Sequence, residues 1–160
     1  MGWVNFPLVL ILVLGGLLVA AGIEDARCRE IANWKNAAAA LLAPVFWWAN
    51  GLSPWPDMAI QLAAAALIFV LFVGVFAAGW MGGGDVKLIG ALALWLPLDA
   101  LSTMLVVMSI AGGAVTLVMI AERRLRPRDP AAPVEVPYGV AIAFAGLLAL
   151  HEPILNHLSR

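Results

Sequence analysis

The stretch WMGGGDVKLIG, residues 80–90, interrupts a chain that consists otherwise of long apolar runs. It places three consecutive glycines and two charged residues, Asp85 and Lys87, between two of these runs. The 160 residues are 64% hydrophobic and only 12% charged. Such a composition is typical of a membrane protein with several spans rather than of a soluble domain. An aspartate on a flexible backbone in such a chain therefore needs a physical explanation.

Six apolar runs flank this stretch on both sides. A helix needs about 20 mostly apolar residues to cross a hydrocarbon core of ~30 Å. The first run has no basic residues before it, unlike a signal peptide, so we expect it to be retained as a span. The fourth is too short to span comfortably. The runs predict an all-α membrane protein of about six transmembrane helices in one bundle, forming a single domain over residues 1–160: Phe6–Ile23, Ala37–Leu52, Met58–Trp80, Val86–Leu98, Ala100–Ala121 and Val136–Leu150.

Basic residues are distributed unevenly among the connections between these runs. Arg160 is the one Lys or Arg outside the connections after the first, third and fifth runs. The positive-inside rule predicts that these three connections face the cytoplasm and that both termini lie outside. Their basic residues are Arg27, Arg29, Lys35, Lys87, Arg123, Arg124, Arg126 and Arg128.

This topology puts two aspartates at the same membrane face. Asp25 follows the first run and Asp85 precedes the fourth, whereas Asp57 and Asp99 fall on the opposite side. The segment from Asp85 to Asp99 would be roughly 21 Å long as a helix, which is shorter than the hydrocarbon core. We therefore expect Asp85 to lie below the cytoplasmic surface in a wet recess. Non-helical backbone there needs shielding, and three glycines would give it the required freedom.

Ionisable groups at such a depth are costly and therefore indicate function. Two neighbouring carboxyls in a medium of low dielectric do not both ionise easily, so the pair would share one proton near neutral pH. That is the working state of an aspartic protease.

Simpler interpretations exist for each stretch. Residues 24–30, EDARCRE, can be an ordinary solvated loop, and GGGD can be a turn whose aspartate caps the next helix. A small proton-coupled transporter or channel could use the same aspartates, although the spans are nearly bare of the polar residues that transport needs. A non-catalytic assembly subunit of a secretion machine is a third alternative. Asn33 and Asn36 are expected to cap the second helix, and a role in lining the site is a weaker alternative.

Three motifs resemble a known family. GGGDVKL, Gly82–Leu88, resembles the Gly-x-Gly-Asp motif of intramembrane aspartic proteases, in the form found in type IV prepilin peptidases. DARCREIANWKN, Asp25–Asn36, is similar to the first motif of that family, with Ala32 where the family usually has proline. PYGVAIAFAG, Pro137–Gly146, is similar to the segment that opens its last helix.

The resemblance implies an aspartic endopeptidase that cleaves the short basic leader from prepilins or pseudopilins at the cytoplasmic face of the bacterial inner membrane. By motif position, it implies that Asp25 and Asp85 are the catalytic pair and that Gly82, Gly84 and Lys87 support them. No metal or organic cofactor is implied.

The first connection also resembles one form of that family in particular. It contains Cys28 alone, without the cysteine-rich insertion of the longer methylating members. The chain therefore resembles the minimal tight-adherence (Flp-type) form, for which methylation is not expected. The expected partners are a prepilin precursor and membrane lipid. A net charge of −1 gives no sign of nucleic-acid binding, and no pattern indicates an oligomeric state.

Overall fold

The computed structural model describes residues 6–125 and 136–151 of the chain. In these residues the protein is all-α, and a single turn of π-helix, η1 (Pro54–Met58), leads into the third helix. The prediction of an all-α membrane protein is confirmed, because each predicted apolar run coincides with one helix. The α-helices of the described part are α1 (Phe6–Cys28), α2 (Asn33–Ala49), α3 (Ala59–Ala77), α4 (Gly83–Ala93), α5 (Leu98–Leu125) and α6 (Tyr138–Ala149).

The helices differ in how far they can reach across a membrane. In the described residues, three segments are long and apolar enough to cross it: Phe6–Cys28, Pro54–Ala77 and Leu98–Glu122. Helix α4 has only 11 residues, which is too few to cross a core of ~30 Å. This helix is short, as its sequence predicts, and most of its residues are buried.

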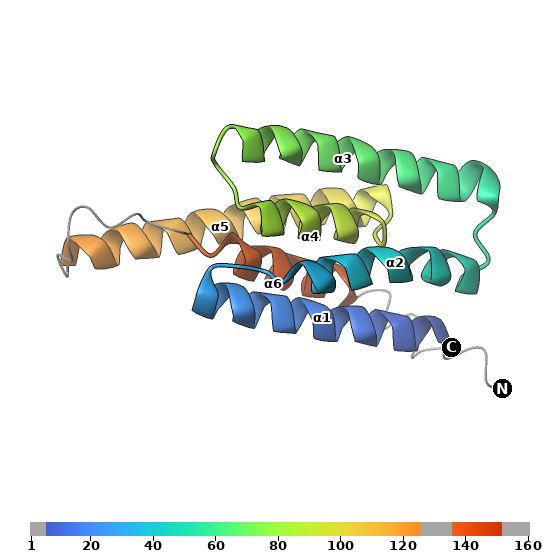
Figure 1. Ribbon diagram of the computed structural model, residues 1–160, viewed down its shortest axis with the longest axis horizontal. Helices are drawn as coiled ribbons and strands as arrows, with labels where there is room; N and C mark the ends of the chain where they lie inside the picture. Colours follow the sequence, from blue (N-terminus) through green and yellow to red (C-terminus); the bar gives the residue numbers. More distant parts are fainter. Residues whose placement is uncertain (1–5, 126–135, 152–160) are drawn as a thin grey trace.

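Helix α4 lies at the centre of the bundle. It packs against α2, α3 and α6, while α1 packs against α2 and α6, and α5 packs against α6. Figure 1 shows α3 on the outside of α4, with α2 and α1 on the other side. The hydrophobic core therefore forms around a helix that is too short to span the bilayer itself.

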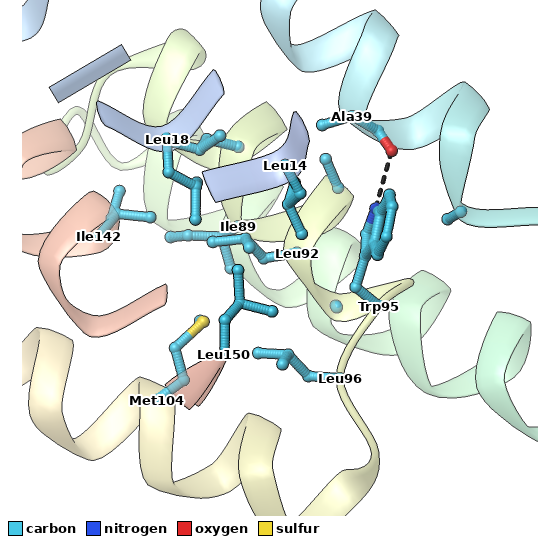
Figure 2. Packing of buried hydrophobic residues seen from close by; sticks show 14 of the residues in the cluster. Leu14, Leu18, Ala39, Ile89, Leu92, Trp95, Leu96, Met104, Ile142 and Leu150 are labelled. Carbon is cyan, nitrogen blue, oxygen red and sulfur yellow. Dashed lines mark hydrogen bonds between the residues drawn. The ribbon is translucent and has the colours of Figure 1, made fainter. Parts of the chain in front are cut away.

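The core contains residues of all six α-helices, and Figure 2 shows part of it. Because lipid tails are as apolar as these side chains, close van der Waals packing rather than the hydrophobic effect holds such helices together. The Trp95 indole also donates a hydrogen bond to the Ala39 carbonyl (2.8 Å), which ties the end of α4 to α2. The largest fully buried core side chains include Leu14 and Leu18 of α1, Ile89 and Leu92 of α4, Met104 of α5 and Ile142 of α6.

The C-terminal end of α4 lies inside the bundle, where its free carbonyls need donors. The Gln61 amide donates to the carbonyl of Ala93 (2.8 Å), and the Trp47 indole donates to the carbonyl of Leu94 (2.7 Å). Unpaired carbonyls are costly in a membrane, so these two side chains allow a short helix to end there.

One end of the bundle collects the segments that carry the three motifs. The C-terminal end of α1 and the N-terminal ends of α2, α4 and α6 lie at this end, and α5 extends beyond them on the same side (Figure 1). The described helices place Arg27, Lys35, Lys87 and Arg124 at these same helix ends. Other residues of the basic pattern, namely Arg126, Arg128 and Arg160, lie outside the described residues.

The expected boundary of the first helix is wrong. Helix α1 continues beyond Ile23 to Cys28, so Asp25 lies in its last turn rather than in the connection that follows. The helix ends where Arg29 takes a left-handed backbone conformation, with φ of +58°. This conformation is a common helix stop, and it turns the chain back sharply towards α2.

The expected non-helical backbone at the triple glycine is also wrong. Gly83 and Gly84 are the first residues of α4, and Gly82 precedes them in an extended conformation with φ of −70°. The left-handed glycine of this turn is Gly79, with φ of +76°. A regular helix pairs backbone groups that an irregular segment would leave unpaired in the membrane, which explains why the helix begins so early.

Candidate active site

Asp25 is held between the end of α1 and the start of α6. Its side chain is buried, with 4% exposure, and its Oδ2 accepts a hydrogen bond from the backbone N–H of Val140 (3.2 Å). Gly139 leaves the necessary space, because a β-carbon there would lie 2.8 Å from the Asp25 carboxyl carbon. The free N–H groups at the start of α6 thus face a carboxyl group, which gives one of them a hydrogen-bond partner.

Asp85 occupies the first turn of α4 and is 7% exposed. The backbone amide of Gly82, the residue that precedes the helix, lies against the Asp85 carboxyl. An acidic side chain that reaches back from this position to the capping residue is one half of a capping box. The geometry is therefore compatible with a helix cap, and a cap at this place also fixes the direction of the carboxyl group.

The fold brings the two aspartates together from α1 and α4. They lie close enough for their charges to interact, and the charge of Arg29 also reaches Asp25. In the described part of the chain neither aspartate forms an ion pair, and no group of three His, Cys, Asp or Glu side chains is arranged to hold a metal ion. Two buried carboxyls that interact in this way favour a state with a single shared proton.

Ile31 fills the space between the motif segments and is 6% exposed. A β-carbon on Gly84 would lie 3.2 Å from the Ile31 β-carbon, and one on Gly139 would lie 2.8 Å from its Cδ1. Both distances are shorter than ordinary van der Waals contacts. Glycine is therefore needed at Gly84 and Gly139 for close approach to Ile31, not for backbone freedom.

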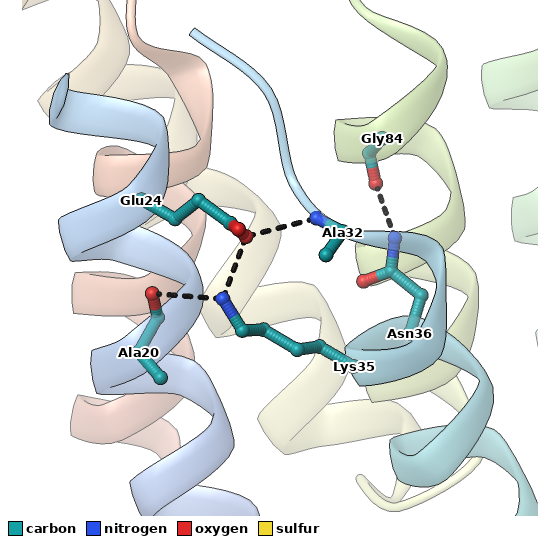
Figure 3. Close-up of polar contacts among 6 residues, drawn as sticks. All are labelled: Ala20, Glu24, Ala32, Lys35, Asn36 and Gly84. Atoms are coloured by element: carbon teal, nitrogen blue, oxygen red, sulfur yellow. Dashed lines mark hydrogen bonds and ion pairs between the residues drawn. The ribbon is translucent and has the colours of Figure 1, made fainter. Parts of the chain in front are cut away.

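An ion pair fixes the short connection between α1 and α2 (Figure 3). Glu24 Oε2 accepts hydrogen bonds from the Lys35 ammonium (2.6 Å) and from the backbone N–H of Ala32 (2.9 Å). Lys35 also donates to the carbonyl of Ala20 (3.4 Å). Because Ala32 follows Ile31 directly, these contacts hold Ile31 in its place beside the aspartates.

The two asparagines of the first motif bind α4 instead of capping α2. The residue before α2 is Ala32, and no side chain caps the helix there. Asn36 instead donates to the Gly84 carbonyl (3.1 Å; Figure 3), and Asn33 accepts a hydrogen bond from the Lys87 ammonium (2.7 Å). Lys87 is exposed, and this contact ties it to α2.

Several residues of this end were not singled out by sequence reasoning. Ile31, Glu24 and Lys35 lie within or beside the first motif, and Gly139 lies within the third. Their positions within or beside the motifs could have singled these residues out, but the sequence does not show which residues they contact. The partners of Gly139 and Ile31 come from distant parts of the chain, and a single sequence does not reveal such pairs.

Comparison with known proteins identifies the family of the chain. The model of the type IV leader peptidase family matches residues 12–117, a range that contains both aspartates. The chain belongs to the type IV leader peptidase family. The family resemblance is thus confirmed, and the matched range contains the first two motifs, whereas Pro137–Gly146 lies beyond it. In this member, residues 29–32 join α1 to α2 directly, without a cysteine-rich insertion.

The relatives are longer than this chain. Two proteins of Burkholderia pseudomallei, from strains 1026b and K96243, are each named prepilin leader peptidase/N-methyltransferase. Each is 28% identical to this chain over 120 residues. The match covers 69% of this chain but 37% of each relative, so the chain spans little more than a third of their length. No solved structure matches the chain.

Proposed function

We propose that this chain is an aspartic endopeptidase of the bacterial inner membrane that cleaves the leader from type IV, Flp-like prepilins. The observation that carries the proposal is the meeting of two buried carboxyls, Asp25 from α1 and Asp85 from α4, at one end of the bundle. Membership of the type IV leader peptidase family and the names of the two relatives support the substrate class. Such a precursor carries a short basic leader followed by one apolar helix.

The proposed reaction uses the two aspartates as a general acid and a general base. The ionised carboxylate takes a proton from a water molecule, whose oxygen attacks the carbonyl carbon of the scissile peptide bond. The protonated partner gives its proton to the carbonyl oxygen, which forms a tetrahedral intermediate. Collapse of the intermediate breaks the C–N bond, the leaving amine takes the proton held by the base, and the acid is reprotonated from the diol.

The environment suits this chemistry in two ways. Burial of both aspartates lowers the local dielectric, and this strengthens the interaction of each carboxyl with developing charge. The helix ends around the pair carry basic residues, so the positive-inside rule supports a cytoplasmic position for the site. A basic leader on that side of the membrane would be cleaved from the apolar helix that follows it.

The test is cleavage of a prepilin precursor by purified variants in lipid nanodiscs. Asp25→Asn and Asp85→Asn should each lower the rate by roughly 10²-fold to 10⁴-fold, the range for loss of a general acid or base. Asp99→Asn is the matched control, because Asp99 is exposed and lies at the start of α5. Substantial cleavage by either site variant would refute the assignment of the pair.

A further inference from the structure

A groove of about 530 Å³ lies between α2 and α3, with α4 as its floor. Small side chains dominate its lining on all three helices, and they let another helix approach closely. In the described part of the chain, no other element fills the groove. Its small lining residues are Ala37 and Ala40 of α2, Ala65 and Ala66 of α3, and Gly90 and Ala91 of α4.

The groove has a polar end and an apolar end. Asn33, Asn36 and Lys87 line it near the starts of α2 and α4. Leu62 and Leu94 line its other end. The polar end adjoins the aspartate pair, because Asn36 binds the carbonyl of Gly84, the residue directly before Asp85.

Building on the proposed function, we propose that this groove receives the first turns of the apolar helix of the prepilin substrate, with the start of that helix at Asn36. The first N–H groups of any helix lack partners within the helix, and the polar end of the groove offers them Asn33 Oδ1, which accepts one hydrogen bond from Lys87 and has room for a second. The α4 stripe from Lys87 to Leu94 is roughly 10 Å long, about two helical turns. The scissile bond, which precedes the helix, then lies beside Gly84 and Asp85.

A lipid acyl chain is the competing occupant of such a groove. It would fill the apolar part equally well. It gives no reason for the polar end of the groove to adjoin the aspartate pair, whereas a substrate helix that starts at this end does.

The first experiment fills the groove and measures kcat and KM for a precursor in nanodiscs. Ala66→Leu places a larger side chain in the groove and should raise KM roughly tenfold, because the added atoms occupy space that the substrate helix needs. Ala63→Leu is the matched control, since Ala63 is exposed on the same helix but does not line the groove, and its KM should equal that of the wild type.

The second experiment maps the register of the bound helix by disulfide cross-linking. Cys28→Ser removes the native cysteine, and Asp85→Asn keeps the precursor intact. Ala37→Cys should then cross-link to a cysteine in the first turn of the precursor helix. Leu62→Cys should cross-link about two turns further along, and Ala63→Cys should not cross-link.

The outcomes separate this inference from the proposed function. If the wild type cleaves and the aspartate variants do not, the proposed function stands. The groove assignment is then overturned if Ala66→Leu matches wild type and Ala37→Cys and Leu62→Cys capture no precursor. That result would leave the groove to lipid. If the wild type cleaves no precursor, the proposed function fails, and the groove assignment fails with it.

Discussion

A β-carbon at Gly139 would lie 2.8 Å from the carboxyl carbon of Asp25. The backbone of α6 therefore touches a side chain of α1 directly, and the N–H of Val140 reinforces the contact with a hydrogen bond. The start of α6 therefore limits how far the Asp25 side chain can extend towards that helix. This contact makes the third motif part of the site, although it contains no acidic residue.

Gly139→Ala should therefore impair catalysis while the protein still accumulates in the membrane. The added methyl must displace either Asp25 or Ile31, and misplacement of a catalytic group by about 1 Å can cost roughly 10²-fold in rate. The measurement is kcat for precursor cleavage. Gly16→Ala is the control, because a β-carbon there meets no neighbour within 4 Å in the helix that carries Asp25. A Gly139→Ala variant as active as wild type would show that α6 does not position the aspartate.

The glycines of the second motif should differ in their tolerance to substitution. A β-carbon at Gly84 would lie 3.2 Å from Ile31, whereas one at Gly83 would lie 3.4 Å from the Phe76 ring, an ordinary contact. We expect Gly83→Ala to cleave almost normally, Gly84→Ala to be slower, and Gly84→Val to lose nearly all activity. Membrane insertion must be checked first, for example by size-exclusion chromatography of each purified variant. Equal cleavage rates for Gly83→Ala and Gly84→Val would contradict the packing explanation.

The ion pair between Glu24 and Lys35 should matter through the position of the loop that it holds. Lys35→Met removes the ammonium that Glu24 binds, so the connection carrying Ile31 is held less firmly, and the cleavage rate should fall. The exchange of both charges, Glu24→Lys with Lys35→Glu, should restore part of that rate. Glu30→Gln is the control, since Glu30 is exposed in the same connection. Full activity of Lys35→Met would show that the ion pair does not hold the loop for catalysis.

The pattern of hydropathy and charge was sufficient to predict the helices and the end of the bundle where the motifs meet. Each apolar run became a helix, and the short run before Leu98 became the short α4. These features follow from local composition, which acts over one helix at a time. Single-sequence reasoning therefore gave the order of the elements and the approximate positions of Asp25 and Asp85.

The local backbone conformation and the contacts between helices could not be predicted from the single sequence. The glycines at 82–84 were expected to be irregular, but Gly83 and Gly84 begin a helix whose backbone groups pair internally. The small size of Gly84 leaves room for Ile31, which lies in the α1–α2 connection. Asn36 was expected to cap its own helix and instead binds Gly84. For the size of Gly84 and the contact of Asn36, a partner distant in sequence decided the outcome, and one sequence contains no record of that partner.

The two aspartates should behave as a unit. If they share a proton and act on the same bond, the double variant Asp25→Asn with Asp85→Asn should be no slower than either single variant, since the effects of such groups are not additive. The measurement is the residual cleavage rate over long incubations at high enzyme concentration. A double variant that multiplies the two single losses would indicate independent roles.

The orientation of the bundle can be tested with one native and one introduced cysteine. Cys28 is exposed at the end of α1, beside the aspartates, so in the proposed orientation it faces the cytoplasm. A maleimide that does not cross membranes should leave Cys28 unlabelled in intact cells and label it after lysis. In a Cys28→Ser background, Ser53→Cys should be labelled in intact cells, because Ser53 lies at the other end of α2, between that helix and α3. A reversed pattern would put the aspartates on the outer face, away from any basic leader that remains in the cytoplasm. It would contradict the proposed cleavage site even if both aspartates proved essential.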